Sequence, residues 1–486
     1  MKESYVCEQT WREDFVRYSL IKPYLSKIEA KRVGKELLSL GLPAMAENAL
    51  HMLLGIVDTA FLGHLSWQAM TGAGLANQLF FVLQVFIVAV STGVTVLVAN
   101  SVGAKNYRMV GNVVWNSLYL AFGWGVLLMC LAPFSKYLLS IFPKSDQIVY
   151  QSAVDYLQVI LYGILGMFLM AVLSASLKGA GDTKTPMFVV AMSNLLNVFL
   201  DYAMIFGKFG FPALGVKGAA LATIISRFFG SILLFIAIMK SERLNVKPKY
   251  VRLFNLKIIK NILSVGLPTS FESLSFSAGL IIFTNILFIA GPMAYAGHRI
   301  GINIESLSFM PGLGISVAVT TLVGMYNGKG DLTKVAGVVR QGWIIITIFQ
   351  VSVGVFILLF PEPLILLFTK EPEIVQLAKL PVRLIGMFQF FLALDFLANG
   401  ALRGTANTSV PFIFTTIAMW LVRLPLAFVL VSHFNLGLLG GWIGMISDIV
   451  FRSTTKILYY LSGKWEKKAE KVRTSVKSNS LIEEKT

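Results

Sequence analysis

The feature that most constrains this chain is a series of apolar segments, each long enough to cross a bilayer. A spanning helix needs about 20 predominantly apolar residues. Twelve such runs lie at 38–62, 72–101, 110–133, 152–177, 185–206, 215–239, 259–289, 299–326, 335–360, 378–402, 409–432 and 437–461. Only 14% of the 486 residues are charged, against about 25% in a soluble domain. The sequence therefore predicts an all-α polytopic membrane protein with twelve transmembrane helices, and it excludes a single soluble domain.

The second half of the chain repeats the first. Gly41-Leu42-Pro43 recurs 225 positions later as Gly266-Leu267-Pro268, and the same shift pairs Leu177-Lys178-Gly179 with Leu402-Arg403-Gly404. Glycine and proline have specific backbone roles, so their agreement at one shift indicates a duplicated unit. Each unit has an even number of crossings and enters the membrane in the same orientation. We therefore expect two six-helix bundles related by a pseudo-two-fold axis along the membrane normal, with a cavity between them.

Basic residues set the predicted topology. The formal net charge is +17, but the Lys and Arg residues concentrate at the termini and in the connections, as the positive-inside rule requires of cytoplasmic segments. This distribution argues against nucleic-acid binding. It predicts a multi-pass protein of the cytoplasmic membrane with both termini in the cytoplasm. We expect a cytosolic leader (1–36), an N-terminal bundle (37–240), a basic cytoplasmic linker (241–258), a C-terminal bundle (259–462) and a basic cytosolic tail (463–486).

Three ionisable residues share one face of the first predicted helix. Glu47, His51 and Asp58 lie within about 40° of one another at 100° per residue. An ionisable group inside a span costs about 2.5–3.5 kcal/mol on insertion scales, so this face must meet protein or water rather than lipid. Glu47 could instead anchor the cytoplasmic end of the helix. Asp58 has apolar residues on both sides, which favours a functional role.

The fifth predicted helix carries a matching polar face. Asn194, Asn197 and Asp201 lie within about 60° of one another, and Thr223 on the sixth helix could add a hydroxyl group. One amide would be an ordinary interhelical hydrogen bond, but two amides and a carboxylate form an oxygen-rich group that suits a proton or Na⁺. Gln84 on the second helix is either packing polarity or part of a cavity.

The acidic residues of the second half are placed differently. Glu272 opens the seventh predicted helix, and Asp395 lies in the tenth, on the same face as Asn399 and Arg403. We consider both acids as a candidate second polar site, with an ion pair between Asp395 and Arg403 as the structural alternative. Three further embedded charges receive no transport role from the sequence: Glu305, Arg227 and Arg423.

Motifs for enzymatic chemistry are missing from the sequence. It has no P-loop, no Gly-x-Ser-x-Gly, no His-Glu-x-x-His and no paired-cysteine metal motif. Its two cysteines, Cys7 and Cys130, offer neither a disulfide framework nor a metal cluster. We therefore expect no enzyme, no cofactor, no metal other than Na⁺ and no ATPase subunit, so that transport is driven by an ion gradient or is passive.

Several motifs together resemble the multidrug and toxic compound extrusion (MATE) family, bacterial or archaeal type, over about residues 35–462. They are Gly41-Leu-Pro43, Val57-Asp58-Thr59 with Gly63, Leu177-Lys-Gly-Ala-Gly-Asp-Thr183 with Pro186, Asn197-Val-Phe-Leu-Asp201, Gly215-Val-Lys-Gly-Ala-Ala-Leu-Ala-Thr223 and Leu402-Arg-Gly404. The resemblance implies a V-shaped exporter of twelve helices that exchanges H⁺ or Na⁺ for organic, often cationic, drugs.

The family's cation site, carried over by position, falls on Asp58, Asn197, Asp201 and Thr223. Tyr156 matches a family position near the drug pocket. In the second half the resemblance would place the acids about one helical turn away, where this chain has Phe276 and Leu392. Further candidates for the substrate cavity come from the polar faces: Glu47, His51, Asn194 and Gln84.

The sequence thus predicts a secondary active antiporter that works by alternating access. Its expected cargo is a small organic, cationic compound, its coupling ion is H⁺ or Na⁺, and its other contacts are membrane lipids. A monomer is expected. The alternatives are a flippase for a lipid-linked saccharide, which would need several embedded arginines for a pyrophosphate, and an uncoupled channel or receptor, whose flux would not depend on a counter-ion.

Overall fold

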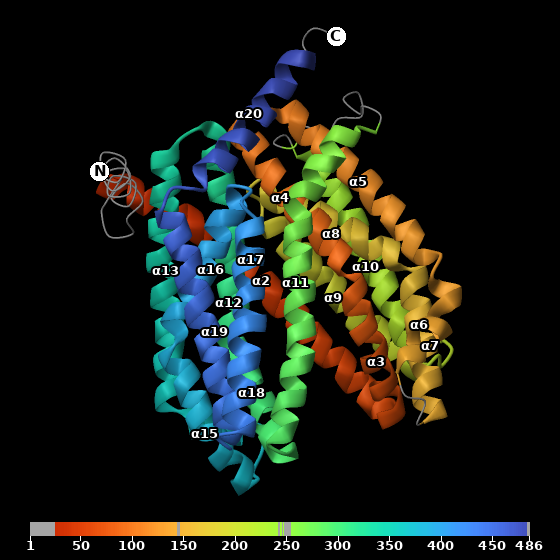
Figure 1. The fold of residues 1–486 in the computed structure, drawn as a ribbon. Helices are drawn as coiled ribbons and strands as arrows, with labels where there is room; N and C mark the ends of the chain where they lie inside the picture. Colours follow the sequence, from red (N-terminus) through yellow and green to blue (C-terminus); the bar gives the residue numbers. More distant parts are fainter. Residues whose placement is uncertain (1–24, 143–145, 242–243, 245, 247–253, 484–486) are drawn as a thin grey trace. The chain divides into compact units, whose positions relative to one another are not determined.

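The computed structural model describes residues 25–142, 146–241, 244, 246 and 254–483, and in this part of the chain the only regular structure is helical. Figure 1 shows the helices in chain order. Those of the first half are α2 (Lys27–Leu65), α3 (Trp67–Leu83), α4 (Val85–Gly103), α5 (Tyr107–Met129), α6 (Ser135–Leu138), α7 (Gln147–Tyr162), α8 (Ile164–Gly179), α9 (Lys184–Phe206) and α10 (Val216–Lys240), with 3-10 turns at Ala132–Phe134 and Leu139–Ile141.

The second half continues in the same way. Its helices are α11 (Leu256–Ile289), α12 (Pro292–Lys329), α13 (Leu332–Leu359), α14 (Pro361–Leu366), α15 (Pro372–Met387), α16 (Gln389–Gly404), α17 (Ser409–Ile417), the π-helix η4 (Ala418–Arg423), α18 (Leu424–Ser432), α19 (Gly437–Leu461) and α20 (Glu466–Glu483). Every predicted span coincides with one of these helices or with consecutive segments of them, which confirms the prediction of an all-helical polytopic protein.

Most of these helices are long and apolar enough to cross a membrane. Nine meet that description among the described residues, and two bent pairs, α7–α8 and α15–α16, raise the number to eleven. The twelfth predicted span corresponds to α19, which is 25 residues long and carries Asp448, Arg452 and Lys456. Its length is sufficient for a bilayer, and its charges account for its lower hydropathy.

Two compact units make up the fold. Unit 1 consists of residues 1–45 and 271–478, and unit 2 contains residues 46–270 together with the end of the chain. Their boundaries fall inside α2 and α11, two residues after Pro43 and Pro268. In unit 1, Gly314 of α12 approaches Met45 of α2, and in unit 2, Gly266 of α11 approaches Ala89 of α4. Each of these two long helices therefore contributes residues to both units.

The internal repeat extends to the details of the backbone. The α7–α8 pair bends by 54° at Gly163, and the α15–α16 pair bends by 52° at Phe388, which is 225 positions later. At the same shift, the positive φ angles of Lys105 and Gly181 recur at Gly330 and Ala406. The two halves were therefore built on one template, as the sequence indicated.

Helix caps follow the repeat as well. Asn106 accepts a hydrogen bond from the Met109 backbone N–H at 3.0 Å and caps α5, and Asp331 accepts one from Lys334 N–H at 3.0 Å and caps α13. A short side chain with an oxygen atom satisfies a backbone donor that the first turn of a helix leaves free. The chain thus starts corresponding helices by the same local chemistry.

Small residues allow the helices of each unit to approach closely. A methyl group on Gly179 of α8 would meet the carbonyl of Thr95 and the side chain of Val98 in α4, and one on Gly404 of α16 would meet Thr320 and Val323 in α12. Close backbone approach at small residues is a general means of packing membrane helices, because lipid offers no hydrophobic driving force for their association.

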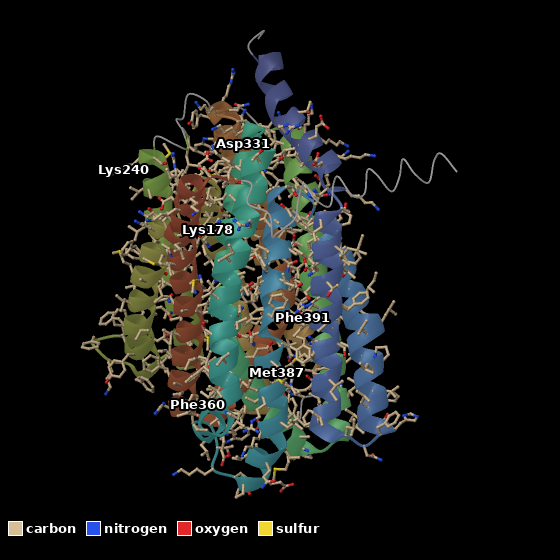
Figure 2. All side chains as sticks on the ribbon, turned by 90° about the vertical axis from the view of Figure 1, so that its left-hand side faces the viewer. Lys178, Lys240, Asp331, Phe360, Met387 and Phe391 are labelled. Carbon is tan, nitrogen blue, oxygen red and sulfur yellow. The ribbon has the colours of Figure 1, made fainter. Side chains whose placement is uncertain are left out.

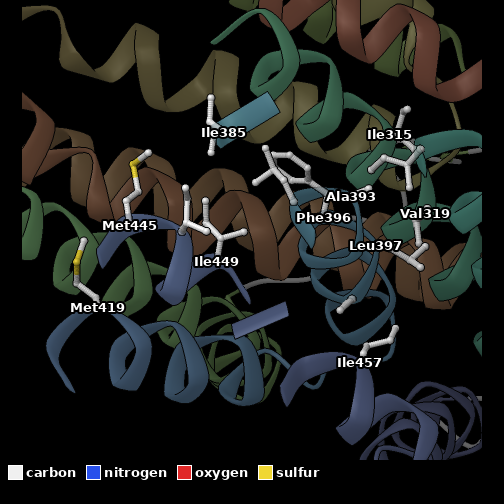
Figure 3. Close-up of a cluster of buried hydrophobic side chains, with 14 of the residues drawn as sticks. Ile315, Val319, Ile385, Ala393, Phe396, Leu397, Met419, Met445, Ile449 and Ile457 are labelled. Atoms are coloured by element: carbon white, nitrogen blue, oxygen red, sulfur yellow. The ribbon is translucent and has the colours of Figure 1, made fainter. Parts of the chain in front are cut away.

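The interior of unit 1 is a large apolar cluster. It includes Ile315, Val319, Phe396, Leu397 and Ile449 from α12, α16 and α19, as Figure 3 shows. Figure 2 places Asp331, at the start of α13, and Phe360, after its end, at opposite ends of this unit.

The first and last described segments of unit 1 lie near the α12–α13 turn. At this turn the Tyr326 hydroxyl donates to Glu36 of α2 at 2.9 Å, and the Asn327 amide donates to the Ala469 carbonyl of α20 at 3.3 Å. The start of α2 and the tail helix α20 therefore lie at the same end of unit 1.

One sequence prediction needs correction, and two terminal segments gain detail. The segment 72–101 is two helices, because the chain breaks at Gln84, which ends α3 and starts α4. The leader is helical from Lys27 onward and continuous with α2, and its first 24 residues lie outside the described part. The tail forms α20. Trp465, the residue before this helix, stacks on Tyr460 with ring centroids 5.5 Å apart.

We expect Gly179→Ala and Gly404→Ala each to destabilise the protein by about 1–3 kcal/mol, because overpacking a tight contact costs that much. Thermal unfolding of the purified protein would measure the loss. Gly123→Ala is the matched control, since a methyl group there meets no atom within 4 Å, and it should leave the unfolding temperature close to that of the wild type. Equal effects at all three positions would contradict the packing described here.

Candidate functional site

The polar faces predicted on the first and fifth spans meet inside unit 2. The carboxyl groups of Asp58 of α2 and Asp201 of α9 lie close enough to interact directly. The side chain of Asp201 is only 1% exposed, and its Oδ1 has no protein hydrogen-bond partner among the described residues. Two bare carboxylates at this separation repel each other strongly in a medium of low dielectric constant. The pair therefore requires a proton or another cation.

An amide and a backbone N–H hold the pair from the side. The Asn197 side chain, turned so that its nitrogen faces the acid, donates to Asp58 Oδ1 at 3.1 Å, and its oxygen accepts from the Thr223 backbone N–H at 3.1 Å. The Thr223 hydroxyl donates to the Ala219 carbonyl at 3.1 Å. The four residues predicted for the cation site thus lie together. Thr223 takes part through its backbone N–H, whereas its hydroxyl group donates within α10.

Two further residues adjoin this carboxylate pair. Tyr156 of α7 is buried, interacts electrostatically with both acids and lies beside Asn77 of α3. Arg227 of α10 exerts its largest electrostatic interaction on Asp58, and its guanidinium also contacts the sulfur of Met170 at 4.0 Å. From the sequence we expected Arg227 either to extend toward the interface or to pair with acids, and its interaction with Asp58 agrees with the second expectation. Its position four residues after Thr223, on the same face of α10, was the available signal.

Glu47 belongs to a separate ion pair. Lys178 Nζ, at the end of α8, lies 2.7 Å from Glu47 Oε1, and Ser174 donates to the same carboxylate at 3.4 Å. The carboxylate is 3% exposed, whereas the side chain of His51 is 42% exposed and lies 4.0 Å away. Lys178 and Lys240 lie at the same end of unit 2 in Figure 2. Glu47 therefore lies in the middle of α2, beside the end of α8, with its charge balanced by a lysine.

Two other cavity candidates make local contacts. Asn194 donates to the Leu50 carbonyl of α2 at 2.8 Å and links α9 to α2. Gln84 lies at the α3–α4 break, where its backbone carbonyl accepts a hydrogen bond from Val88 at 3.1 Å. Both contacts shape the backbone of unit 2.

The Glu47–Lys178 pair has a counterpart in unit 1, at the repeat shift of 225. Arg403 Nη2 lies 2.9 Å from Glu272 Oε2, and Thr415 donates to Glu272 Oε1 at 3.0 Å. The structural alternative considered for Arg403 is therefore wrong in its partner, because this arginine pairs with Glu272 instead of Asp395. Its neighbour Asn399 does donate to Asp395, at 3.2 Å.

Asp395 is bound by two cations of α19. Lys456 Nζ lies 2.8 Å from its Oδ1, and Arg452 Nε lies 3.7 Å from its Oδ2. On the same helix, Asp448 lies 2.5 Å from Arg423 and 3.9 Å from Arg452. The sequence analysis overlooked Asp448, Arg452 and Lys456, although their spacing of four residues places them on one face of a helix.

Arginines of this network also lie against aromatic rings. The guanidinium of Arg423 is 5.4 Å from the centre of the Phe276 ring and 5.5 Å from that of Phe283, and Arg452 is 5.6 Å from Phe276. Cation–π contacts at such distances are attractive and gain strength when the groups are desolvated. Glu305 of α12 is buried and interacts electrostatically with Arg423 and Arg452.

An apolar cavity of about 760 Å³ lies elsewhere in unit 1. It is bounded by α15, the π-helix η4 and α19, with Leu384, Phe388, Val422, Ile443 and Val450 among its lining residues. Its lining contains no charged residue, only three hydroxyl groups in addition to apolar side chains. It is therefore distinct from both charged clusters.

Comparison with known proteins agrees with this arrangement. A sequence model of the MatE family matches the chain twice, over residues 43–203 and 268–429, and the two matches begin 225 positions apart. The chain belongs to the MatE family. Because members of this family are transporters, the chain is a multi-pass membrane transporter and not an enzyme.

Individual relatives cover nearly the whole chain. The probable multidrug resistance protein NorM of Thermotoga maritima is 57% identical over 95% of this chain and 99% of its own length. The multidrug resistance protein MdtK of Yersinia pseudotuberculosis is 27% identical over 90% and 96%. Among solved structures, a multidrug resistance MATE family transporter of the MOP superfamily in an outward-facing conformation is similar, with a TM-score of 0.82, 22% identity and coverage of 93% and 99%. At that identity the likeness concerns the fold alone.

We expect Lys178→Met to lower the stability of the protein by about 1–3 kcal/mol, because it leaves the buried Glu47 carboxylate without its cation. The double variant Glu47→Gln/Lys178→Met removes both charges and should recover most of that loss. Thermal unfolding of the wild type, of Glu47→Gln, of Lys178→Met and of the double variant forms a double-mutant cycle. Additive effects of the two substitutions would show that the pair does not interact.

Proposed function

We propose that this chain is a secondary active antiporter that exports small organic, cationic compounds in exchange for H⁺ or Na⁺. The observation that carries the proposal is the pair of neighbouring buried acids Asp58 and Asp201 inside a membrane-spanning unit, with the Asn197 amide on Asp58 and no hydrogen-bond partner on Asp201 Oδ1 among the described residues. A single nearby cation, Arg227, can balance only one of the two charges. The remaining charge calls for a mobile cation, which a gradient across the membrane can supply.

The chemistry of the pair suits such a cation. Carboxylate oxygens are preferred ligands of hard cations, and a shared proton satisfies two facing carboxyl groups equally well. Asp201 Oδ1 is buried and has no protein partner among the described residues, so one oxygen is free to bind the ion. In this mechanism, ion binding from outside changes the hydrogen bonds among α2, α9 and α10, and this change favours release of the cargo.

The class of cargo is inferred from relatives and from composition. Two of the relatives bear names that describe multidrug resistance proteins, which supports export of several organic compounds. The chain contains 36 Phe and 18 Met residues. Aromatic rings attract cations, and methionine adapts to ligands of different shape. A cationic, partly apolar compound fits both properties.

The location in the cell follows from the charge distribution. We place the protein in the cytoplasmic membrane with both termini in the cytoplasm, because the basic residues concentrate in the termini and in the middle connection. Its partners are the organic substrate and membrane lipids, and it acts as a monomer.

A flippase for lipid-linked saccharides would use the embedded basic residues differently. Such a protein needs unpaired arginines to bind a pyrophosphate. In unit 1, Arg403, Arg423 and Lys456 each lie within 3 Å of an acidic side chain. Their charges are already balanced, which favours a cationic cargo over an anionic one.

Asp201→Asn should abolish ion-coupled efflux, because an amide cannot take up a proton or supply a carboxylate oxygen to Na⁺. Everted membrane vesicles with an imposed pH or Na⁺ gradient would measure the coupling. The matched control is Asp155→Asn, which changes a partly exposed acid of the same unit that pairs with Lys217 at 3.4 Å. If coupled efflux persisted in Asp201→Asn, the carboxylate pair would have no part in coupling.

Expression in an efflux-deficient host should lower the accumulation of ethidium, a cationic dye. Dissipating the gradient of the coupling ion should restore ethidium accumulation. The pH gradient and the Na⁺ gradient are dissipated separately, and the treatment that restores accumulation identifies the coupling ion. An uncoupled channel would change accumulation without regard to either gradient, so that result would contradict antiport.

A further inference from the structure

The buried charges of unit 1 balance one another in number. Its acids are Glu272, Glu305, Asp395 and Asp448, and its cations are Arg403, Arg423, Arg452 and Lys456. Seven of the eight are less than 9% exposed as whole residues, and the eighth, Arg403, is partly exposed and pairs with Glu272. Four negative and four positive groups leave no net charge for a mobile ion to neutralise.

Lys456 is one of two fully buried members of this network, together with Asp448. Its side chain is 0% exposed, and its ammonium group lies 2.8 Å from Asp395 Oδ1. Arg452 approaches the other carboxylate oxygen, and Asn399 donates to that same oxygen. A buried lysine is costly unless it is paired. Asp395 is therefore surrounded by donors that belong to the protein itself, in the position where a bound cation would otherwise lie.

Comparison of the repeats separates shared pairs from those unique to one unit. The Glu47–Lys178 pair recurs as Glu272–Arg403, at the same shift of 225. The carboxylate pair does not recur, because the position 225 after Asp58 is Phe283. The Asp395–Lys456 pair is equally unique, since the position 225 before Asp395 is Met170. The two units therefore share one ion pair and differ in a second one. Unit 2 has two neighbouring carboxyl groups, whereas unit 1 has a carboxylate paired with a lysine.

We propose that Lys456 is a built-in counter-cation that permanently occupies the carboxylate site of unit 1. Unit 1 then takes up no coupling ion, and the ion requirement of transport is set by the Asp58–Asp201 pair of unit 2 alone. The statement about the ion requirement of transport rests on the proposed antiport function. Whether Lys456 occupies the cation position beside Asp395 can be tested without measuring transport.

Removal of the ammonium group should expose a latent cation site. Lys456→Met keeps a long side chain but leaves Asp395 with the neutral amide of Asn399 and with Arg452, a cation that is 3.7 Å away and shared with Asp448. A small cation such as Na⁺ can then enter beside the carboxylate. The wild-type unit 1 has no such vacancy, so its stability should not depend on which monovalent cation is present.

The test uses the full-length purified protein in the Asp201→Asn background, which silences the ion site of unit 2. Thermal unfolding is measured in sodium chloride and in choline chloride at equal ionic strength. We expect the same unfolding temperature in both salts for Asp201→Asn. After addition of Lys456→Met, the unfolding temperature should be lower in choline than in sodium, and the further change Asp395→Asn should remove this difference. No merely structural role of Lys456 would create a sodium dependence.

Two results would overturn the inference. One is a sodium-dependent shift in Asp201→Asn with Lys456 intact that disappears on adding Asp395→Asn, because unit 1 would then bind the ion beside its lysine. The other is a Lys456→Met protein that gains no stability from sodium. If Lys456→Met does not fold, Asp395→Asn/Lys456→Met replaces it, since this double variant buries no unpaired charge, and its efflux in vesicles is measured with Asp201 intact.

The vesicle measurement also separates this inference from the proposed function. Asp395→Asn/Lys456→Met should retain the ion dependence of efflux, and its loss in a protein with normal thermal stability would place coupling in unit 1. If Asp201→Asn alone kept its coupling, the proposed function would fail, whereas the sodium dependence of Lys456→Met would still report on the occupancy of Asp395.

Discussion

Burial of acidic side chains among apolar helices is the constraint on which the rest of this structure depends. An isolated carboxylate in a low-dielectric interior is far too costly to persist, so each acid must find a cation, a proton or several donors. Glu47, Glu272, Asp395 and Asp448 find lysine or arginine side chains. Asp58 and Asp201 find each other, an amide and one more distant arginine. The acids of unit 1 named here are therefore neutralised by side chains of the protein, whereas the Asp58–Asp201 pair of unit 2 has fewer cationic partners than acids.

The duplicated fold makes this difference easier to interpret. Bends, left-handed backbone positions and helix caps coincide at a shift of 225 residues, so the two units share one backbone plan. Features found in both, such as the close approach of Gly179 and Gly404 to neighbouring helices, belong to that plan. Features found in one alone, such as the Asp58–Asp201 pair, are where the units have specialised.

Much of the fold was predictable because hydropathy and helix length are imposed directly by the bilayer. The grouping of Asp58 with Asn197, Asp201 and Thr223 was also predictable, since helical periodicity placed each on a polar face. The break at Gln84 was not predictable, because no proline or charged residue interrupts the run from 72 to 101. The partner of Arg403 could not be found either, because it lies on a helix 131 residues away in the chain.

The contacts of three buried cations and the apolar cavity both depend on how helices pack together. Arg227, Arg452 and Lys456 follow polar residues by four positions, a spacing that was visible in the sequence. For Arg227 the sequence left two expectations, extension toward the interface or pairing with acids. For Arg452 and Lys456 the spacing shows a shared helix face but does not say which helix supplies the acidic partner. The approach of α15, η4 and α19 that forms the apolar cavity depends on tertiary packing and leaves no periodic signal in the chain.

The position of α19 has a consequence for biosynthesis. Asp448, Arg452 and Lys456 all lie on this helix, which is the last of the twelve predicted spans, whereas Asp395 lies on α16 and Arg423 at the end of η4. Because the ribosome delivers the chain from its amino terminus, these earlier charges enter the membrane before their counter-charges have been made. The translocon must therefore keep the C-terminal helices together until α19 emerges, and a nascent chain released before that point would carry an unneutralised aspartate into the lipid.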